Sequence, residues 1–387
     1  MIHRFAVFTL TVCFLNAVSL AQPPGRRFPP QFNSTQVSPE RKITFRVYAP
    51  DAQEARLSSS DIPDMRDAPA MTKNDEGIWE MTVGPVPAGA YRYTFNVDGL
   101  DFADPRNPAT SESNANSVSL VTVPGSELFD TKAVPHGNVA KVTYFSKTLD
   151  RNRRMHVYTP PGYESGDGEF PVFYLLHGAT DGDSSWSTVG RAGFILDNLI
   201  ADGKAVSMIV VMPHGHTGPF VFGMTNNSFE KQMSDFQKDF ESEVRPYIES
   251  HYRTINDRQH RAIAGLSMGG AQTLNIAFDN LADYAYVGVY SSGIFGIAGG
   301  FGGGEPNTQW EQSHLETLDK ANLKDGLTLF WFGTGKDDFL LNTTQATVKM
   351  FKDHGFDVKY DETKGGHTWL VWRDYLSEFA PKLFRTN

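Results

Sequence analysis

The sequence predicts two successive domains: a small all-β, immunoglobulin-like sandwich, and then an α/β domain with a mostly parallel, doubly wound sheet. Two observations lead to this fold class. Between residues 41 and 123, short stretches alternate apolar and polar residues and are separated by turn residues. From about residue 141, near-continuous apolar runs alternate with stretches of helical spacing. Alternation is typical of strands with one solvated face, whereas unbroken apolar runs indicate strands that helices cover on both faces.

The bulk composition is that of a globular chain. Its 387 residues are 40% hydrophobic and 21% charged, which leaves room for two domains with cores of their own. The formal net charge of −10 argues against nucleic acid or an anionic membrane as a partner. Nothing in the sequence predicts the oligomeric state.

The first 21 residues have the layout of a secretory signal peptide. His3 and Arg4 precede an apolar run over residues 5–18, and small residues follow at Ser19 and Ala21. The alternative is a membrane anchor, but the run is short for a bilayer and ends in an A-x-A-like site. We therefore expect cleavage after Ala21 and a secreted or periplasmic chain without membrane contact.

The mature chain is expected to contain no cysteine. The single Cys13 lies inside the signal segment, and Val12 before it argues against a lipoprotein signal. Without disulfides, the exported chain would depend on core burial alone. Residues 22–36 are rich in proline and lack an apolar period, so they are predicted to be a flexible leader.

Residues 37–123 form the predicted sandwich. In "KITFRVYAP" the apolar side chains fall on alternate residues, and "EARLS", "GIWEMTVG", "GAYRYTFNVDG" and "NSVSLVTV" repeat this pattern. Several short strands separated by turns are typical of a sandwich of about immunoglobulin size.

The stretch "GPVPAGAYRYTFNVDGLDFADPRNP" resembles carbohydrate-binding module 48, the early-set domain at the front of glycogen-branching and debranching enzymes. This resemblance implies a carbohydrate partner. Trp79, Tyr91 and Tyr93 either stack on sugar rings or pack in the core of the sandwich.

Residues 124–140 are predicted to be a linker, and residues 141–387 to be the α/β domain. Predicted buried strands include "FPVFYLL", "SMIVVMP", "RAIAGL", "YVGVY" and "LTLFWFG". Predicted helices include "GFILDNLIADGK", "FQKDFESEVRPYIESHY", "MGGAQTLNIAFDN" and "TTQATVKMFKDHG". Because strands and helices alternate, the sheet is expected to be mostly parallel.

The stretch "AIAGLSMGGA" places Ser267 between a predicted buried strand and a predicted helix. Gly265 and Gly269 flank this serine in the pattern G-x-S-x-G. A nucleophile elbow needs this order, because the serine stands on a tight turn where neighbouring side chains would clash. The N–H groups at the start of the helix would favour a developing oxyanion. Ser267 is therefore the predicted nucleophile.

The partners of such a serine follow it in the order acid, then histidine. Only His354 and His367 lie beyond the last plausible acid, and His367 stands in the glycine-rich loop "KGGHTWLVW" between a strand and a helix. His367 is the predicted base. Asp337 and Asp338 both end the strand "LTLFWFG"; Asp338 is preferred because apolar residues follow it, and Asp337 stays the alternative acid.

Two backbone amides are predicted to hold the oxyanion. One is the N–H of Met268, directly after the nucleophile, and the other comes from the loop after "FYLLHG", through Ala179 or Gly178. His177 is expected to shape this loop from beneath rather than to react.

Three tryptophans stand in segments expected to border the cleft. They either stack on an aromatic acyl group or a sugar, or they pack in the core. The three are Trp186, Trp310 and Trp369. No cluster of His, Asp or Glu has the spacing of metal ligands, so neither a metal nor another cofactor is expected.

Six stretches in this order carry a second resemblance: "YLLHG", "DNLIADGKAVSMIVVMPHG", "VRPYIESHYR", "RAIAGLSMGG", "GTGKDDFLL" and "GGHTWLVWRDYL". Together they resemble the esterase-D-like group of carbohydrate esterase family 1, the feruloyl and acetylxylan esterases. The resemblance implies an α/β-hydrolase fold and an exported serine esterase acting on feruloyl or acetyl esters of polysaccharides such as xylan. It implies these site residues: Ser267, Asp338 and His367, with Met268 and Ala179 as oxyanion donors.

The chain departs from that pattern on the substrate side. The oxyanion loop reads H-G-A-T-D where a second glycine is common, and "MPHG" replaces M-P-N-G. A serine peptidase or a sugar acyltransferase on the same fold stays an alternative, as does a non-catalytic glycan-binding protein. The glycine-rich stretch 296–307 is either a flap beside the site or a surface insertion.

Overall fold

The computed structural model describes residues 30–65, 70–221, 226–299 and 305–385. The expected signal peptide and the first part of the leader, up to residue 29, lie outside the described residues. Residues Asn33–Asn387 cluster into one compact unit, which holds both expected domains. Within the described residues, none of the helices combines the length and the apolar character needed to cross a bilayer.

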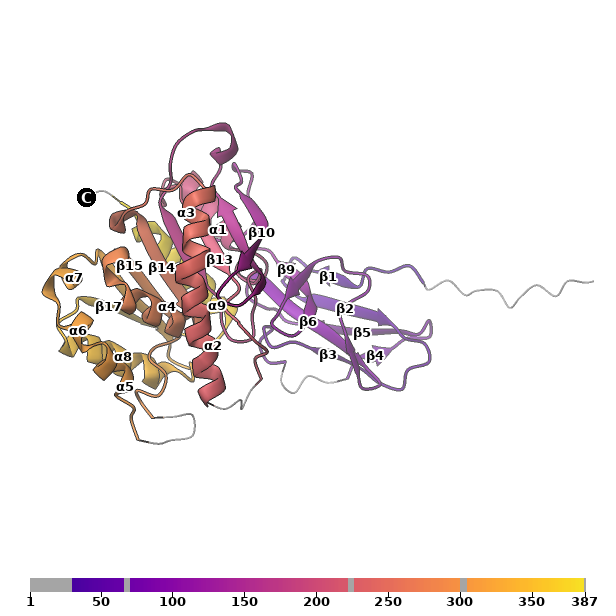
Figure 1. The fold of residues 1–387 in the computed structure, drawn as a ribbon. Coiled ribbons are helices and arrows are strands. Elements are labelled where there is room, and N and C mark those ends of the chain that lie inside the picture. The colour runs from indigo at the N-terminus through magenta and orange to yellow at the C-terminus, as the bar shows by residue number, and fades with distance from the viewer. Residues whose placement is uncertain (1–29, 66–69, 222–225, 300–304, 386–387) are drawn as a thin grey trace, which may run out of the picture. The chain divides into compact units, whose positions relative to one another are not determined.

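The N-terminal part is a sandwich of two antiparallel sheets (Figure 1). The first has the order β1-β2-β5-β4, with β1 Thr35–Val37, β2 Ile43–Tyr48, β4 Thr72–Lys73 and β5 Ile78–Val83. The second has the order β3-β6-β9-β8, with β3 Ala55–Ser58, β6 Gly89–Val97, β8 Thr110–Glu112 and β9 Ser117–Val123. A short strand, β7 Leu100–Phe102, pairs with β6.

The leader ends earlier than predicted. Thr35, Gln36 and Val37 form β1 and pair in antiparallel register with β2, so the expected flexible segment 22–36 is wrong in its last residues. Three residues with a single apolar side chain, Val37, carry little signal, and their pairing with β2 makes them a strand.

The core of the sandwich contains the three aromatic rings for which the sequence allowed either sugar stacking or core packing. Tyr91 and Tyr93 are fully buried, and Trp79 is 7% exposed and donates its indole N–H to the carbonyl of Ala49 over 2.9 Å. These rings pack between the sheets, so stacking on a sugar is the wrong interpretation for all three.

The α/β part is built on an eight-stranded sheet of order β10-β11-β13-β12-β14-β15-β16-β17. The first two strands, β10 Asn138–Ser146 and β11 Arg151–Thr159, are antiparallel to their neighbours. The other strands run parallel: β12 Val172–Leu176, β13 Ile209–Pro213, β14 Arg261–Leu266, β15 Tyr286–Tyr290, β16 Leu329–Gly335 and β17 Val358–Thr363. The predicted α/β-hydrolase fold with a mostly parallel sheet is confirmed.

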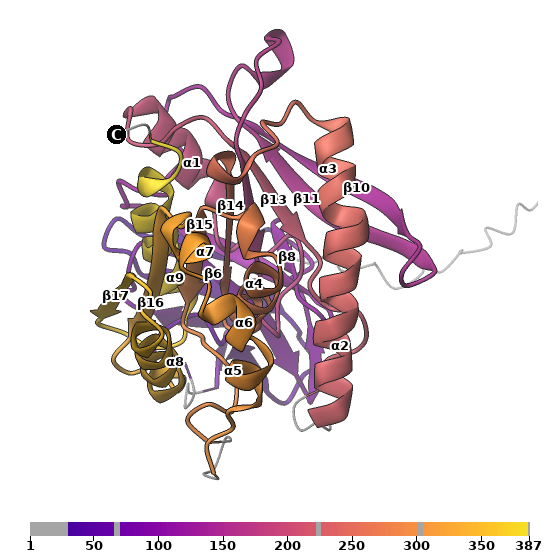
Figure 2. The same cartoon turned by 60° about the vertical axis from the view of Figure 1, so that its left-hand side comes forward.

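Helices cover both faces of this sheet (Figure 2). One face packs against α1 Ala192–Ala201 and α9 Trp369–Phe379. The other packs against α4 Met268–Asp279, α8 Leu341–Asp353 and a long helical rod made of α2 Asn226–Asp239, the π-helical turn Phe240–Val244 and α3 Arg245–His251. Three short helices, α5 Gln309–Ser313, α6 Leu315–Leu318 and α7 Ala321–Asp325, precede β16.

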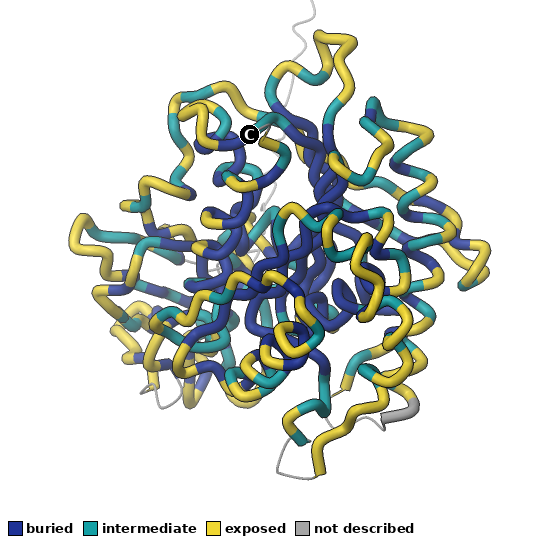
Figure 3. Tube along the Cα trace, turned by 90° about the vertical axis from the view of Figure 1, so that its left-hand side faces the viewer, coloured by how far each residue is buried: buried dark blue, intermediate teal, exposed yellow. Residues whose placement is uncertain are grey.

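The central strands are buried along their whole length, which explains their unbroken apolar sequence. All five residues of β12 and of β13 and all six of β14 are buried. Along β12, alternate side chains enter the two different cores on either side of the sheet. Figure 3 shows these buried segments at the centre, with the exposed residues gathered at the periphery.

The predicted linker 124–140 is an anchored segment. Its last three residues already belong to β10, and the ring of Phe129 is buried in the core beneath α1. Asn198 in α1 donates hydrogen bonds to the carbonyls of Leu128 and Asp130, each at a distance of 3.0 Å. The stretch was predicted to be a linker, but Asn198 of α1 holds two of its carbonyl groups.

Candidate active site

Ser267 stands on a tight turn between β14 and α4. Its backbone has φ 52° and ψ −120°, a conformation that residues other than glycine rarely adopt. The turn brings strand and helix close enough that a Cβ atom on Gly265 would lie 2.3 Å from the carbonyl oxygen of Gly269. A Cβ on Gly269 would lie 2.6 Å from the carbonyl oxygen of His177. Both glycines of the motif are therefore required by the close packing of backbone against backbone.

The predicted serine, histidine and acid lie within hydrogen-bonding distance of one another. His367 Nε2 is 3.0 Å from Ser267 Oγ, and His367 Nδ1 is 3.0 Å from both carboxylate oxygens of Asp338. The serine follows β14, the acid follows β16, and the histidine lies between β17 and α9. The carboxyl ends of three parallel strands thus bring together residues 100 positions apart in the sequence.

The environment of Asp338 keeps it ionised. Burial of this carboxyl group opposes ionisation, but the hydrogen bond and charge of His367 and the N–H of Leu340 outweigh it and hold the pKa of Asp338 below its ordinary value. Asp337 is exposed, and in the described structure no hydrogen bond joins its carboxylate to His367. The structure thus brings Asp338, and not the alternative Asp337, to the imidazole.

The two residues predicted to supply the oxyanion donors, Met268 and Ala179, lie next to Ser267 and next to Gly178, which approaches it. Met268 is the first residue of α4, where the N–H groups have no partner within the helix. The other amide belongs to Ala179 in the loop after β12. A Cβ on Gly178, the residue before it, would lie 3.4 Å from the Cβ of Ser267. Among the described residues, neither amide donates a hydrogen bond to the protein.

His177 holds this loop from beneath, as expected. Its Nε2 accepts the N–H of Gly215 over 2.8 Å, so the proton is on Nδ1, which donates to the carbonyl of Gly178 over 2.8 Å. Gln272 of α4 donates to the carbonyl of Gly215 over 2.9 Å. Burial lowers the pKa of His177, which keeps the imidazole neutral in this role.

Two more histidines, His214 and His216, lie beside His177. Burial and the neighbouring His177 lower the pKa of His214 to about 3, and burial together with both other rings lowers that of His216 to about 2. Neutral imidazoles are good metal ligands. However, in the part of the chain that the structure describes, no three His, Cys, Asp or Glu side chains are grouped to hold a metal ion.

An apolar cluster lies beside the two amides. Both residues that carry them, Ala179 and Met268, belong to it. The other members are Phe229 and Met233 of α2, Ala271 of α4 and Phe295. On the other side of the triad, the ring of Phe339 is 63% exposed and lies 4.3 Å from the imidazole of His367, centroid to centroid. Phe229, Met233 and Phe295 were not predicted from the sequence, since only the fold brings them to the serine.

Of the three tryptophans, Trp186 and Trp369 are buried in the core, while Trp310 is partly exposed and its predicted substrate contact stays a prediction. Trp186 and Trp369 are 0% and 2% exposed and pack edge to face within the core beneath α1 and α9. Trp310 stacks on His314 and donates its indole N–H to Asn275 over 2.8 Å, so it joins α5 to α4. Large apolar rings serve a core as well as a binding site, and here core packing uses Trp186 and Trp369.

The glycine-rich stretch 296–307 is closed at its base by a hydrogen bond from the N–H of Asn307 to the carbonyl of Gly296, over 2.9 Å. Its middle part, residues 300–304, lies outside the described residues, so the choice between flap and insertion stays a prediction.

The fold together with the arrangement of Ser267, His367 and Asp338 defines the class of α/β-hydrolases. The profile of a family described as "Putative esterase" matches residues 146–383, and the chain belongs to this esterase family. The profile of carbohydrate-binding module 48, the isoamylase N-terminal domain, matches residues 32–111. The resemblances stated from the sequence are confirmed for both domains.

Curated relatives include an endo-1,4-beta-xylanase/feruloyl esterase of Xylanibacter ruminicola, which is 30% identical over 375 residues. That match covers 94% of this chain and 46% of the relative. Endo-1,4-beta-xylanase Y of Acetivibrio thermocellus is 25% identical over 72% of this chain and 26% of its own length. The chain thus spans less than half the length of these two relatives.

Among solved structures, a ferulic acid esterase is 29% identical with a TM-score of 0.53, over 64% of this chain and 97% of that one. The enterochelin esterase of Shigella flexneri aligns over 91% of this chain and 95% of its own, with a TM-score of 0.63 and 16% identity. The second likeness concerns the fold alone, and it extends across both domains.

Proposed function

We propose that this chain is an exported serine esterase that hydrolyses feruloyl or acetyl esters on plant polysaccharides such as xylan, through an acyl-enzyme on Ser267. The observation that carries this proposal is the chain of contacts from Asp338 through His367 to Ser267 at the elbow.

In the first half of the reaction, His367 Nε2 takes the proton of Ser267 Oγ while Oγ attacks the ester carbonyl carbon. The carbonyl oxygen becomes an oxyanion, to which the N–H groups of Met268 and Ala179 donate. Asp338 holds Nδ1–H and stabilises the imidazolium that forms. The tetrahedral intermediate collapses, the C–O bond to the sugar breaks, and the sugar oxygen leaves with the proton from Nε2.

In the second half, a water molecule replaces the sugar. His367 Nε2 takes one proton from this water, whose oxygen attacks the acyl carbon and again forms an oxyanion at the two amides. The bond to Ser267 Oγ then breaks, Oγ recovers the proton from Nε2, and the carboxylic acid leaves. Histidine suits both proton transfers because its ordinary pKa is about 6.5.

The substrate class is supported by the relatives and by the apolar surroundings of the serine. The names feruloyl esterase and xylanase recur among the relatives, and the N-terminal domain matches a carbohydrate-binding module. The cluster around Phe229, Met233 and Phe295 offers apolar and aromatic surface next to the proposed oxyanion donors, which favours an aromatic acyl group such as feruloyl.

A substrate panel on the purified chain tests the proposal. Methyl ferulate, acetylated xylan and short acyl nitrophenyl esters are compared for the wild type and for Ser267→Ala, together with labelling by a fluorophosphonate. We expect hydrolysis and labelling by the wild type and neither by the variant. Full activity of Ser267→Ala would sink the mechanism. Folded wild type that neither labels nor hydrolyses would favour a glycan-binding protein instead.

Two further assays, with a peptide panel and with added sugar acceptors, separate the other two alternatives. Cleavage of a peptide panel with no ester hydrolysis would indicate a peptidase, and transfer of the acyl group to added sugar acceptors would indicate an acyltransferase. Export is tested separately, by N-terminal sequencing of protein recovered outside the cytoplasm. We expect it to begin at Gln22, and an intact N-terminus in the cytoplasm would contradict export.

A further inference from the structure

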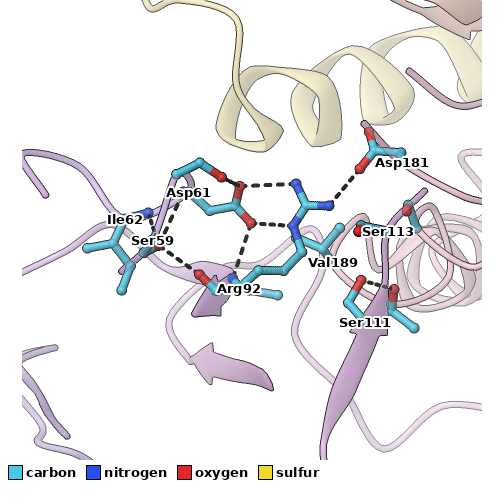
Figure 4. A network of polar contacts seen from close by, with 12 residues as sticks. Ser59, Asp61, Ile62, Arg92, Ser111, Ser113, Asp181 and Val189 are labelled. Atoms are coloured by element: carbon cyan, nitrogen blue, oxygen red, sulfur yellow. Dashed lines mark hydrogen bonds and ion pairs between the residues drawn. The ribbon is translucent and has the colours of Figure 1, made fainter. Parts of the chain in front are cut away.

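The edge of the sandwich lies along the loop that carries the proposed oxyanion donor Ala179. Ser113, directly after β8, pairs with Asp181 as an antiparallel β-bridge, and Asn114 donates its N–H to the carbonyl of Thr180 over 3.1 Å. Further along, the hydroxyl groups of Ser111 and Thr188 are 2.8 Å apart (Figure 4). The sandwich thus contacts the loop 178–188 through backbone hydrogen bonds as well as through side chains.

Arg92 of β6 adds ion pairs to this contact between the sandwich and the loop. Its Nη1 donates to Asp181 Oδ1 over 2.6 Å, while its Nε and Nη2 hold Asp61 in a two-point contact of 2.8 and 3.1 Å (Figure 4). The side chains of Arg92 and Asp181 are only 12% and 2% exposed. Burial opposes the charged guanidinium, but the two carboxylates outweigh this and raise the pKa of Arg92 above its ordinary value.

Asp181 closes the turn that carries the proposed oxyanion donor. Its N–H donates to the carbonyl of Gly178 over 3.1 Å, so residues 178–181 form one tight turn with Ala179 inside it. Gly178 in turn lies against the Cβ of Ser267. A force that holds Asp181 therefore also fixes the direction of the amide of Ala179.

A second group of charged residues contacts Asp183, two residues after Asp181. Arg154 of β11 contacts Asp183 in a two-point contact of 2.6 and 2.8 Å and also contacts Glu112 of the sandwich. His156 Nδ1 lies 2.7 Å from the same carboxylate of Asp183. The loop is thus held by His177, by Arg92 of the sandwich at Asp181, and by Arg154 and His156 of β11 at Asp183.

We propose that the sandwich is a working part of the active site, and that Arg92 is a positioning residue which acts through Asp181 to hold the amide of Ala179 toward the oxyanion. This inference rests on the proposed function. Donors in an oxyanion hole accelerate a reaction only if they are already oriented when charge develops, so the support behind them contributes to the rate.

The test uses the full chain with Arg92→Met, Arg92→Lys, Asp181→Ala and the double variant Arg92→Met/Asp181→Ala, assayed on methyl ferulate. This substrate has no sugar, so lost glycan binding cannot explain a change in rate. The matched control is Arg46→Met, because Arg46 also contacts a carboxylate, Glu80 over 2.5 Å, but within the sandwich. Circular dichroism confirms folding, and Asp181→Ala is the safer variant because it leaves Arg92 paired with Asp61.

We expect kcat to fall about tenfold or more in Arg92→Met and Asp181→Ala, with KM within about twofold, because one donor of an oxyanion hole is worth about 10²–10³ in kcat. The double variant should fall no further than the single variants, since both act on one turn. Arg92→Lys should recover part of the rate, because lysine keeps the charge but loses the two-point contact.

Three results would overturn the inference: kcat within twofold of wild type in folded Asp181→Ala, a rise in KM alone, or an equal fall in Arg46→Met. The proposed function fails in a different way, by a wild type without esterase activity. In that case the rate of fluorophosphonate labelling at Ser267 replaces kcat, and an unchanged rate in Asp181→Ala overturns the inference.

Discussion

Both carboxylate oxygens of Asp338 lie 3.0 Å from Nδ1 of His367. The adjacent Asp337 is exposed, and its backbone N–H donates to the carbonyl of Gly365 over 3.0 Å. Two adjacent aspartates thus face different surroundings, because the turn after β16 buries one of them and exposes the other.

This difference predicts opposite outcomes for the same substitution at neighbouring positions. Asp338→Asn should lower kcat on methyl ferulate by about 10³–10⁴, because an amide no longer holds the Nδ1–H tautomer or stabilises the imidazolium. Asp337→Asn, the matched control, should stay within about twofold of wild type. A large loss in Asp337→Asn with a small one in Asp338→Asn would reverse the assignment.

The strained backbone of Ser267 predicts a difference in stability between two inactive variants. Ser267→Ala and Ser267→Gly both lose the hydroxyl, but only glycine adopts φ 52°, ψ −120° without a steric penalty. In the alanine variant the strained backbone costs about 1–3 kcal/mol. Glycine avoids this strain but loses more conformational entropy on folding, so we expect the glycine variant to be about 1 kcal/mol more stable. Denaturant unfolding of both variants measures this, and equal free energies of unfolding would show that the elbow stores no strain.

The close approach at the elbow predicts that Gly265→Ala is strongly destabilising. The new methyl group would meet the backbone of Gly269 at 2.3 Å, and neither strand nor helix has a flexible end that could yield. We expect a loss of about 3 kcal/mol and loss of esterase activity. Gly168→Ala, in a loop where an added Cβ meets nothing within 4 Å, is the control and should change the free energy of unfolding by less than about 0.5 kcal/mol. Similar losses in the two variants would refute the packing argument.

The buried histidines predict that the protein loses stability as the pH falls. The unfolded chain binds protons at His214 and His216 below an ordinary pKa of about 6.5, whereas their pKa values in the folded chain are about 3 and about 2. Between pH 6.5 and 3, each should therefore lower the free energy of unfolding by up to about 1.4 kcal/mol per pH unit.

Unfolding by urea at several pH values measures this slope. His216→Gln should flatten it, whereas His251→Gln, at an exposed position, is the control and should leave it unchanged. Identical slopes in wild type and His216→Gln would contradict a neutral, buried His216.

The sequence predicts the elbow because its signal is local. The buried strand, the glycines and the helix around Ser267 lie within about twenty residues, and the order of the chain leaves few candidates for the histidine. The strand β10 was missed for the opposite reason. Its residues are mostly exposed, so it lacks the continuous apolar run of the central strands, and pairing with β11 defines it.

The contact between Arg92 and Asp181 has no local signal at all. The two residues are 89 positions apart, and each stands in a stretch that looks complete without the other. The tryptophans illustrate a second limit, because the size that suits Trp186 and Trp369 to a ligand suits them equally to a core. Residue type and spacing identify the reacting groups, while their supports follow from the packing of distant segments.

The pairing between the β8 edge and the loop after β12 decides which pieces of this chain can be exchanged between proteins. A recombination breakpoint between β9 and β10 would separate two recognisable modules and still cut through the hydrogen bonds that Asn114 and Arg92 make with Thr180 and Asp181. Engineers who graft such esterases onto other enzymes should therefore transfer sandwich and catalytic domain together, and natural lineages should inherit the two as a co-adapted pair.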